Sequence, residues 1–175
     1  MFVCQLNLTT APFVPELLQD IALVTFFVDP EVGLRSETNG SDWHLRAYKS
    51  LEGLLALTPP EDAPRLERSF ECQWEACEDH PVYDDPDLVT PEGFDATEVD
   101  LENVARTKIG GYPSNIQSEQ WWALGSDHPA GPAYCLQINS EEKVGLYWGD
   151  AGTVYIARGT TPGHEDEWFL DWQCY

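Results

Sequence analysis

The sequence predicts a single mostly β domain of the α+β class, with two repeat-related β-rich halves and a few short helices. The main observation is an internal sequence repeat, because FVCQLN at residues 2–7 is similar to YCLQIN at residues 134–139. Each copy precedes an apolar, aromatic-rich run, at residues 21–28 and 144–157, which predicts the same strand-to-strand unit twice. With 175 residues, 42% hydrophobic and 12% aromatic, the chain is long and apolar enough for one buried core.

The first half, about residues 1–57, is expected to be built mainly from strands. Strands are predicted at residues 2–8, 21–28 and 44–48. The second of these is a continuous β-branched and aromatic run, which is typical of a strand covered on both faces. Residues 15–20 predict a turn or a short helical loop, because Pro15 suits the first position of a helix. Residues 50–57 are compatible with either a strand or a short helix.

The connector, about residues 58–107, is predicted to be loop-rich and acidic. From residue 61 to residue 102 it carries fifteen acidic residues, and its basic residues there are Arg65 and Arg68. Apolar and polar side chains alternate over residues 70–76, which predicts a half-buried strand with carboxylates on its wet face. Residues 101–108 predict a short helix.

The second half, about residues 108–175, is predicted to become a series of strands from Tyr134 onward. Turn-forming residues interrupt this series at residues 140–142, 149–152 and 161–164. The whole chain, residues 1–175, is therefore predicted to be one domain made of the first half, the connector and the second half.

The net charge of −22 is the strongest guide to partners. Nucleic acids and anionic lipids are excluded as partners, because both are bound by Lys and Arg that neutralise phosphates. A cationic partner is favoured, since an acidic surface speeds its encounter at low salt. The alternative is that the acidity serves solubility or reflects a host with acidic proteins in general.

Composition also indicates the compartment. No run of 18 apolar residues is present, and the N-terminal residues lack the basic segment of a secretory signal. The five cysteines form no C-x-x-C pair, which favours reduced thiols in a cytoplasmic protein. The sequence leaves the oligomeric state open.

Four motifs in the second half resemble a known family. They are KIGGYPSNIQ at residues 108–117, LQIN at 136–139, WGDAG at 148–152 and DWQC at 171–174. In this order they resemble the YwqG-like family, a bacterial domain family of unknown function. The resemblance implies a short member without the Gly- and Pro-rich segment that precedes the first strand in typical members. We therefore expect an exposed edge at that strand.

The residue types in these motifs predict structural roles. Gly110 and Gly111 are expected to adopt positive φ angles, with Pro113 fixing the turn that follows. Amide side chains are expected to hydrogen-bond the backbone at Gln5, Gln117 and Gln137. Asp150 is expected to cap the N–H groups of its own turn.

The residue patterns of the common enzyme classes are absent from the sequence. There is no G-x-S-x-G elbow, no H-E-x-x-H pair, no P-loop and no EF-hand spacing, so neither catalytic residues nor a metal or other cofactor are predicted. Paired carboxylates of the glycosidase type stay open, although no particular pair stands out.

The first functional hypothesis is a non-enzymatic cytoplasmic binding protein whose acidic face engages a basic protein. Its predicted partner-binding residues are Asp84, Asp85, Asp87, Trp121 and Trp122. If the two tryptophans lie on a strand, one ring faces outward and can anchor a partner, whereas in the alternative both are sealed under residues 125–133. The family resemblance implies a concrete version, an immunity protein that blocks a basic nuclease toxin.

The second hypothesis is a hydrolase or small-ligand-binding protein with its site in a cleft between the two halves. Its predicted cleft residues are Gln117, His128 and Asp150, which lie in or near the motif loops. A third interpretation is a scaffold whose acidity has no specific target.

Overall fold

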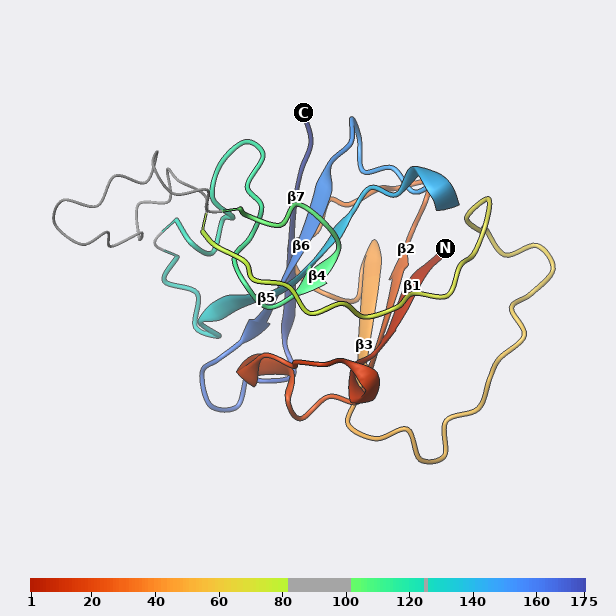
Figure 1. The fold of residues 1–175 in the computed structure, drawn as a ribbon, viewed down its shortest axis with the longest axis horizontal. Coiled ribbons are helices and arrows are strands. Elements are labelled where there is room, and N and C mark those ends of the chain that lie inside the picture. The colour runs from red at the N-terminus through yellow and green to blue at the C-terminus, as the bar shows by residue number, and fades with distance from the viewer. Residues whose placement is uncertain (82–101, 125) are drawn as a thin grey trace, which may run out of the picture.

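The computed structural model describes residues 1–81, 102–124 and 126–175, and its strands form two antiparallel sheets (Figure 1). The first sheet has the order β1-β2-β3 and the second the order β4-β5-β6-β7. The strands are β1 (Phe2–Asn7), β2 (Leu23–Val28), β3 (Trp43–Tyr48), β4 (Lys108–Ile109), β5 (Pro132–Asn139), β6 (Thr153–Gly159) and β7 (Trp168–Gln173). Each half thus contributes one sheet, and β4 is added at the edge of the second.

All helices in the described part of the chain are short 3-10 turns. They are η1 (Leu8–Thr10), η2 (Glu16–Leu18) and η4 (Glu142–Val144). The mostly β prediction is confirmed, but the α+β class is wrong for the described residues, because they contain no α-helix. Most of the buried apolar side chains belong to strands, and the opposite sheet or a loop covers them in place of an α-helix.

The pair β1 and β2 of the first sheet and the pair β5 and β6 of the second sheet share one irregularity. In β1 and β2 the register shifts between Phe2 and Cys4, and in β5 and β6 it shifts between Tyr134 and Leu136. The shifts leave one extra residue on β1 and one on β5, which is the geometry of a β-bulge. Each bulge therefore follows the aromatic residue that opens the two similar segments.

The main core lies between the two sheets. Phe26 of β2 is fully buried, with its ring centroid 6.1 Å from Trp43 and 6.4 Å from Trp148. From the second sheet, Leu136 and Ile156 are equally buried and complete the same cluster. Burial of these large side chains is the dominant stabilising contribution, on the order of 1.5–3 kcal/mol each.

The outer face of the second sheet is covered as well. All seven residues of β6 are buried, because Tyr155 and Ala157 pack away from the main core in a second cluster with Trp122, Ala130 and Phe169. The loop that carries the motif at residues 108–117 belongs to this cover. This double burial explains why β6 shows no polar alternation in the sequence.

Residues 37–39 join the two halves along the free edge of β7. The N–H of Leu170 donates to the carbonyl of Glu37 at 2.8 Å, and the N–H of Asn39 donates to the carbonyl of Trp168 at 3.2 Å. Thr38 also forms an isolated bridge with Phe169. The edge of β7 is thereby covered, whereas β1 and β3 are the edge strands of the first sheet.

Two predicted elements of the connector are absent. Residues 70–76 form no strand, since Trp74 alone among them is half-buried and the other six are exposed. Residues 102–107 form no helix and lead directly into β4. Alternation leads to a strand only where a neighbouring strand accepts its hydrogen bonds. In the described residues, Trp74 contacts the end of β1 through its side chain, since its Nε1 atom donates to the carbonyl of Asn7 at 3.0 Å.

Residues 50–57 form neither of the two predicted alternatives. They make an exposed loop with a turn in which the N–H of Leu54 donates to the carbonyl of Leu51 at 3.3 Å. Gly53 in this turn has a φ of 77°, which favours glycine. The leucines of this segment do not pack in either hydrophobic core, and the exposed fractions of Leu55 and Leu57 are 83% and 86%.

The motif residues have mixed outcomes. Gly110 and Gly111 have φ angles of 68° and 66°, as predicted, and Gln137 is fully buried with backbone hydrogen bonds. The predictions for Gln5 and Gln117 are wrong in the described part of the chain, because both side chains are exposed and neither has a backbone hydrogen bond. Asp150 is also exposed, and its carboxylate caps no N–H group among the described residues.

Candidate functional site

The most distinctive surface of the molecule is an acidic segment at residues 61–78. It follows the exposed loop that projects from the end of β3 and then returns across the body of the protein (Figure 1). Leu66 and Trp74 pack against the main core and hold the segment in place. The carboxylates that it exposes are those of Glu61, Asp62, Glu67, Glu71, Glu75 and Glu78. Of its two basic residues, Arg65 donates to the carbonyl of Pro60 at 2.9 Å.

Asp79 anchors the end of this segment. Its carboxylate lies 2.8 Å from the Nζ atom of Lys108, and both side chains are more than 90% buried. The same carboxylate accepts hydrogen bonds from the N–H groups of Val104 at 2.7 Å and Tyr112 at 2.8 Å. Burial lowers the pKa of Lys108, and the hydrogen bond that its ammonium group donates to Asp79 partly opposes that effect. Asp79 is thus a structural carboxylate and not part of the exposed acidic surface.

This anchor also explains the second glycine of the motif. A Cβ atom at Gly111 would collide with the carboxylate of Asp79, and the φ of 66° is unfavourable for other residues. The glycine therefore allows the buried carboxylate to approach the backbone closely and receive the N–H of Tyr112.

Basic side chains neutralise few of the carboxylates within the described residues. Those within ion-pair distance of a basic side chain are Asp20, Asp79, Asp166 and Glu167. Asp20 and Asp166 each lie within this distance of both Arg158 and Lys49. No carboxylate of the acidic segment forms such a pair within the described residues, because Asp79 lies just beyond the end of the segment. The charge of the segment therefore faces the solvent.

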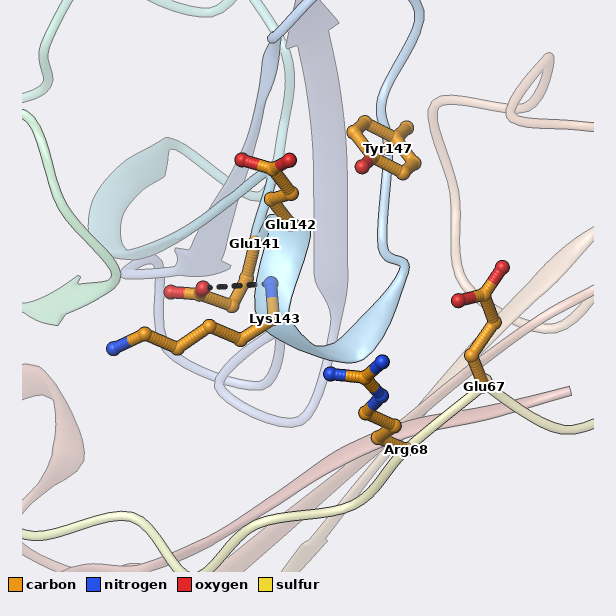
Figure 2. Close-up of a pocket in the computed structure, with 6 residues that line it drawn as sticks. All are labelled: Glu67, Arg68, Glu141, Glu142, Lys143 and Tyr147. Atoms are coloured by element: carbon orange, nitrogen blue, oxygen red, sulfur yellow. Dashed lines mark hydrogen bonds between the residues drawn. The ribbon is translucent and has the colours of Figure 1, made fainter.

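A pocket of about 520 Å³ lies between the acidic segment and η4 (Figure 2). Its lining residues are Glu67, Arg68, Glu141, Glu142, Lys143 and Tyr147. Figure 2 shows the side chain of Arg68 directed from the acidic segment toward η4. Glu67 crosses Gly145, whose added Cβ would come within 2.9 Å of its Cγ atom. The pocket presents both signs of charge, which suits a zwitterionic or carboxylate-bearing small molecule better than an apolar one.

The predicted partner-binding residues have different positions. Asp84, Asp85 and Asp87 lie outside the described residues. Trp121 and Trp122 lie in a turn instead of a strand, so their rings do not point to opposite faces. The two rings pack edge to face with centroids 5.4 Å apart.

The two tryptophans belong to the cover of the second sheet. Trp122 is buried, and the Nε1 atom of the half-buried Trp121 donates to the carbonyl of Leu170 at 3.1 Å. Trp121 also packs against His128, with centroids 6.0 Å apart, and His128 packs against Phe169 at 4.8 Å. Neither ring stands free as an exposed anchor.

The three predicted cleft residues do not converge in the described structure. His128 packs near the beginning of β7, where its Nδ1 accepts from the N–H of Ala130 at 3.2 Å. The carbonyl of Asp150 accepts from the N–H of Tyr175 at 3.1 Å, beyond the end of β7. The N–H of Gln117 donates to Gln173 at 3.1 Å while its own side chain is exposed.

A buried amide pair positions the motif loop on the second sheet. Gln137 accepts from the N–H of Ser114 at 3.0 Å, and Gln173 accepts from the N–H groups of Ile116 and Gln117 at 2.9 and 3.1 Å. The role of Gln173 was not predicted, although its place in the terminal DWQC motif was a signal for it. These amides satisfy backbone groups that the loop would otherwise bury without partners.

Two further findings bear on function. No helix in the part of the chain that the structure describes has the length and apolar character to span a membrane. Among the same residues, no group of three or more His, Cys, Asp or Glu side chains has the arrangement of a metal site.

Comparison with known proteins gives one match. A protein-family model described as "Domain of unknown function (DUF1963)" matches residues 1–157, which is most of the chain. The comparisons with curated proteins and with solved structures gave no match.

Proposed function

The chain belongs to the DUF1963 family, and we propose that it is a non-enzymatic cytoplasmic protein that binds a basic protein partner through its acidic segment. The observation that carries this proposal is the uncompensated charge of residues 61–78. Six of their carboxylates are exposed, and the ion pairs of the described residues involve none of the six.

The physical consequence of this surface is attraction of cationic groups. Exposed like charges that are not paired internally produce a negative potential, which steers a basic protein and raises its association rate at low salt. The segment is also held by Trp74 and Asp79, so its carboxylates are presented on an ordered backbone. Less ordering on binding leaves more of the interaction energy for affinity.

A more specific form of the proposal is an immunity or inhibitor protein of the YwqG-like kind. In this form the carboxylates take the place of phosphates in the cationic substrate groove of a basic nuclease toxin. Asp84, Asp85 and Asp87 belong to this proposal as additional partner-binding residues.

We also propose that the two sheets are copies of one ancestral unit. The support is that the bulge after Phe2 and the bulge after Tyr134 occupy the same place in the two similar segments. When the two copies are aligned, Trp43 corresponds to Trp168 and Val28 corresponds to Arg158. These residues are cross-strand partners in each sheet, since Trp43 pairs with Val28 and Trp168 pairs with Arg158. In this alignment β4 has no counterpart beside β1 among the described residues.

The test compares two triple variants with equal change in net charge. One reverses the acidic segment, with Glu71→Lys, Glu75→Lys and Glu78→Lys. The control reverses exposed carboxylates elsewhere, with Glu16→Lys, Glu31→Lys and Asp127→Lys. Proteins retained from a lysate of the source cells at low salt are identified, and the basic protein among them is purified for titration.

We expect the segment variant to bind the purified basic protein at least tenfold more weakly than the native chain, and the control variant to stay within about threefold. Binding of the native chain should weaken at high salt, because screening reduces the attraction between exposed charges. Equal affinity of both variants, or retention of no basic protein, would refute the proposal. A separate variant with Asp84, Asp85 and Asp87 changed to Lys tests the more specific form.

A second candidate function is binding of a small ligand, and the pocket in Figure 2 favours it. Arg68 and Lys143 line this pocket, and neither forms an ion pair within the described residues. Thermal-shift assays with amino acids, dipeptides and dicarboxylates test this function, with Arg68→Ala as the variant expected to abolish any shift. Gln117→Ala, His128→Ala and Asp150→Ala test the alternative cleft in the same assay.

A further inference from the structure

The loop between β3 and the acidic segment exposes an unusual amount of apolar surface. We call residues 51–57 the leucine loop. Leu51 and Leu54 are about 40% exposed, and the exposed fractions of Leu55 and Leu57 are 83% and 86%. Scattered apolar side chains are normal on a protein surface, but four leucines within seven residues form a concentrated patch, which is typical of an interaction site.

The leucine loop is held at both ends. At its start, the N–H of Glu52 donates to the hydroxyl of Ser50 at 3.0 Å, and Leu54 closes a turn with Leu51. At its end, Pro59 and Pro60 restrict the backbone, and Arg65 and Ala63 both donate to the carbonyl of Pro60. This restriction lowers the entropy that is lost when a partner covers the leucines.

The surroundings of the loop determine which partner fits. Glu52, Glu61 and Asp62 flank the leucines and are exposed, while no basic residue occurs between Lys49 and Arg65. Lys49 lies 3.6 Å from Asp20 and 3.7 Å from Asp166, so its charge is opposed by these carboxylates. The complement of such a surface is an apolar groove with Lys and Arg at its rim.

A second copy of the chain is a poor occupant for the same reason. Each copy has a net charge of −22, so two leucine loops brought together would also bring the flanking carboxylates of both copies together. Repulsion between like charges opposes such contact. Charge therefore selects a basic partner over self-association.

We propose that the leucine loop is the apolar anchor of the interface, and that Leu55 and Leu57 insert into an apolar groove rimmed by basic residues on the partner. This inference rests on the proposed function, because the partner is the basic protein that the acidic segment attracts. The acidic segment supplies long-range attraction, and the leucines supply the short-range contact that slows dissociation.

The first experiment identifies what covers the loop. The full chain is produced in its source cells with a benzophenone amino acid in place of Leu55, and irradiated. A matched control carries the same photoreactive residue in place of Phe13, which is 66% exposed elsewhere on the protein. We expect position 55, and not position 13, to crosslink to a basic protein. A crosslink to a second copy, a crosslink within the same chain, or no crosslink would overturn the inference.

The second experiment measures affinity with the purified crosslinked protein. The variant Leu55→Ser with Leu57→Ser is compared with Leu124→Ser, in which a leucine that is 65% exposed is changed elsewhere. Since both leucines would lose their apolar contact with the partner, we expect the double variant to bind about tenfold more weakly or worse, with the control unchanged. This loss should persist at 0.5 M NaCl, because apolar contact is not screened.

The two proposals fail separately. If the charge-reversed acidic segment loses affinity while the leucine variant binds like the native chain, the inference about the loop is wrong and the proposed function stands. If the leucine variant loses affinity but reversing the acidic segment has no effect, the proposed function is wrong, and with it the basic rim of the groove.

Discussion

Gln137 and Gln5 occupy corresponding positions in the two similar segments, yet their environments differ completely. The Gln137 side chain is fully buried and donates to the carbonyl of Arg106 at 2.9 Å while it accepts from Ser114. Gln5 is exposed on an edge strand of the first sheet. At the scale of single residues, an amide stabilises this fold only where a loop covers it.

The pair gives a controlled prediction. Gln137→Ala should lower the free energy of unfolding by about 2–4 kcal/mol, because it leaves the N–H of Ser114 buried without its acceptor and opens a cavity. Gln5→Ala should change it by less than about 0.5 kcal/mol. Urea unfolding followed by tryptophan fluorescence measures both, and equal losses would show that the buried amide has no special role.

Asp42 carries a pH dependence that is also local. Burial raises the pKa of its carboxyl, but the N–H groups of Arg35 and Ser36 outweigh this effect, so the pKa lies below its ordinary value. A carboxyl with a lowered pKa contributes stability above the ordinary value, and that stability is lost as pH falls through the folded-state pKa.

Asp42→Asn should therefore destabilise the protein by about 1–3 kcal/mol at pH 7, since an amide accepts these hydrogen bonds without charge assistance. The difference in unfolding free energy between the native chain and this variant should shrink as the pH is lowered from 5 to 3. Unfolding in urea at several pH values measures this difference, with the exposed Asp62→Asn as control. A difference that does not vary with pH would contradict the assignment.

At the scale of elements, the connector is ordered by a few anchors in place of secondary structure. Trp74 reaches the main core, and the buried pair of Asp79 and Lys108 fastens the segment to β4. Asp79 also receives two backbone N–H groups, so its removal would affect residues 102–112 as well.

Asp79→Ala should reduce the free energy of unfolding by about 3–5 kcal/mol, because it leaves the ammonium group of Lys108 buried without a partner. The acidic segment should also become more sensitive to limited proteolysis. Asp166→Ala is the control, since the side chain of Asp166 is 84% exposed in its ion pairs and should contribute about 1 kcal/mol or less. Similar small losses in both variants would argue against the anchor.

At the scale of the whole molecule, self-repulsion is the dominant electrostatic term. A net charge of −22 on 175 residues destabilises the compact state, since folding brings the carboxylates closer together. Salt should relieve this repulsion, because the Debye length falls from about 30 Å at 0.01 M to about 8 Å at 0.15 M.

The melting temperature should therefore rise between 0.01 and 0.5 M NaCl. The variant with Glu71, Glu75 and Glu78 changed to Lys should show a smaller rise, because six units of negative charge are removed by the three reversals. Differential scanning calorimetry across the salt series measures this effect. A melting temperature that falls or stays constant with salt would contradict it.

Local patterns indicated the strands of both sheets except β4, which begins where a short helix was predicted to end. The runs around Phe26 and Ile138 predict strands because apolar, β-branched and aromatic side chains are suited to a pleated, buried surface. The glycines at residues 110 and 111 likewise predicted positive φ angles. These features depend on residue type and near neighbours, so the sequence is sufficient to recognise them.

Long-range contacts decided the rest. Alternation at residues 70–76 met no partner strand, and the leucines of residues 51–57 met no core, so neither segment formed its predicted element. Gln173 and Asp79 gained their roles from residues more than twenty-five positions away in the chain. Secondary structure in a β protein requires hydrogen-bond partners from distant segments, and only the tertiary structure brings those segments together.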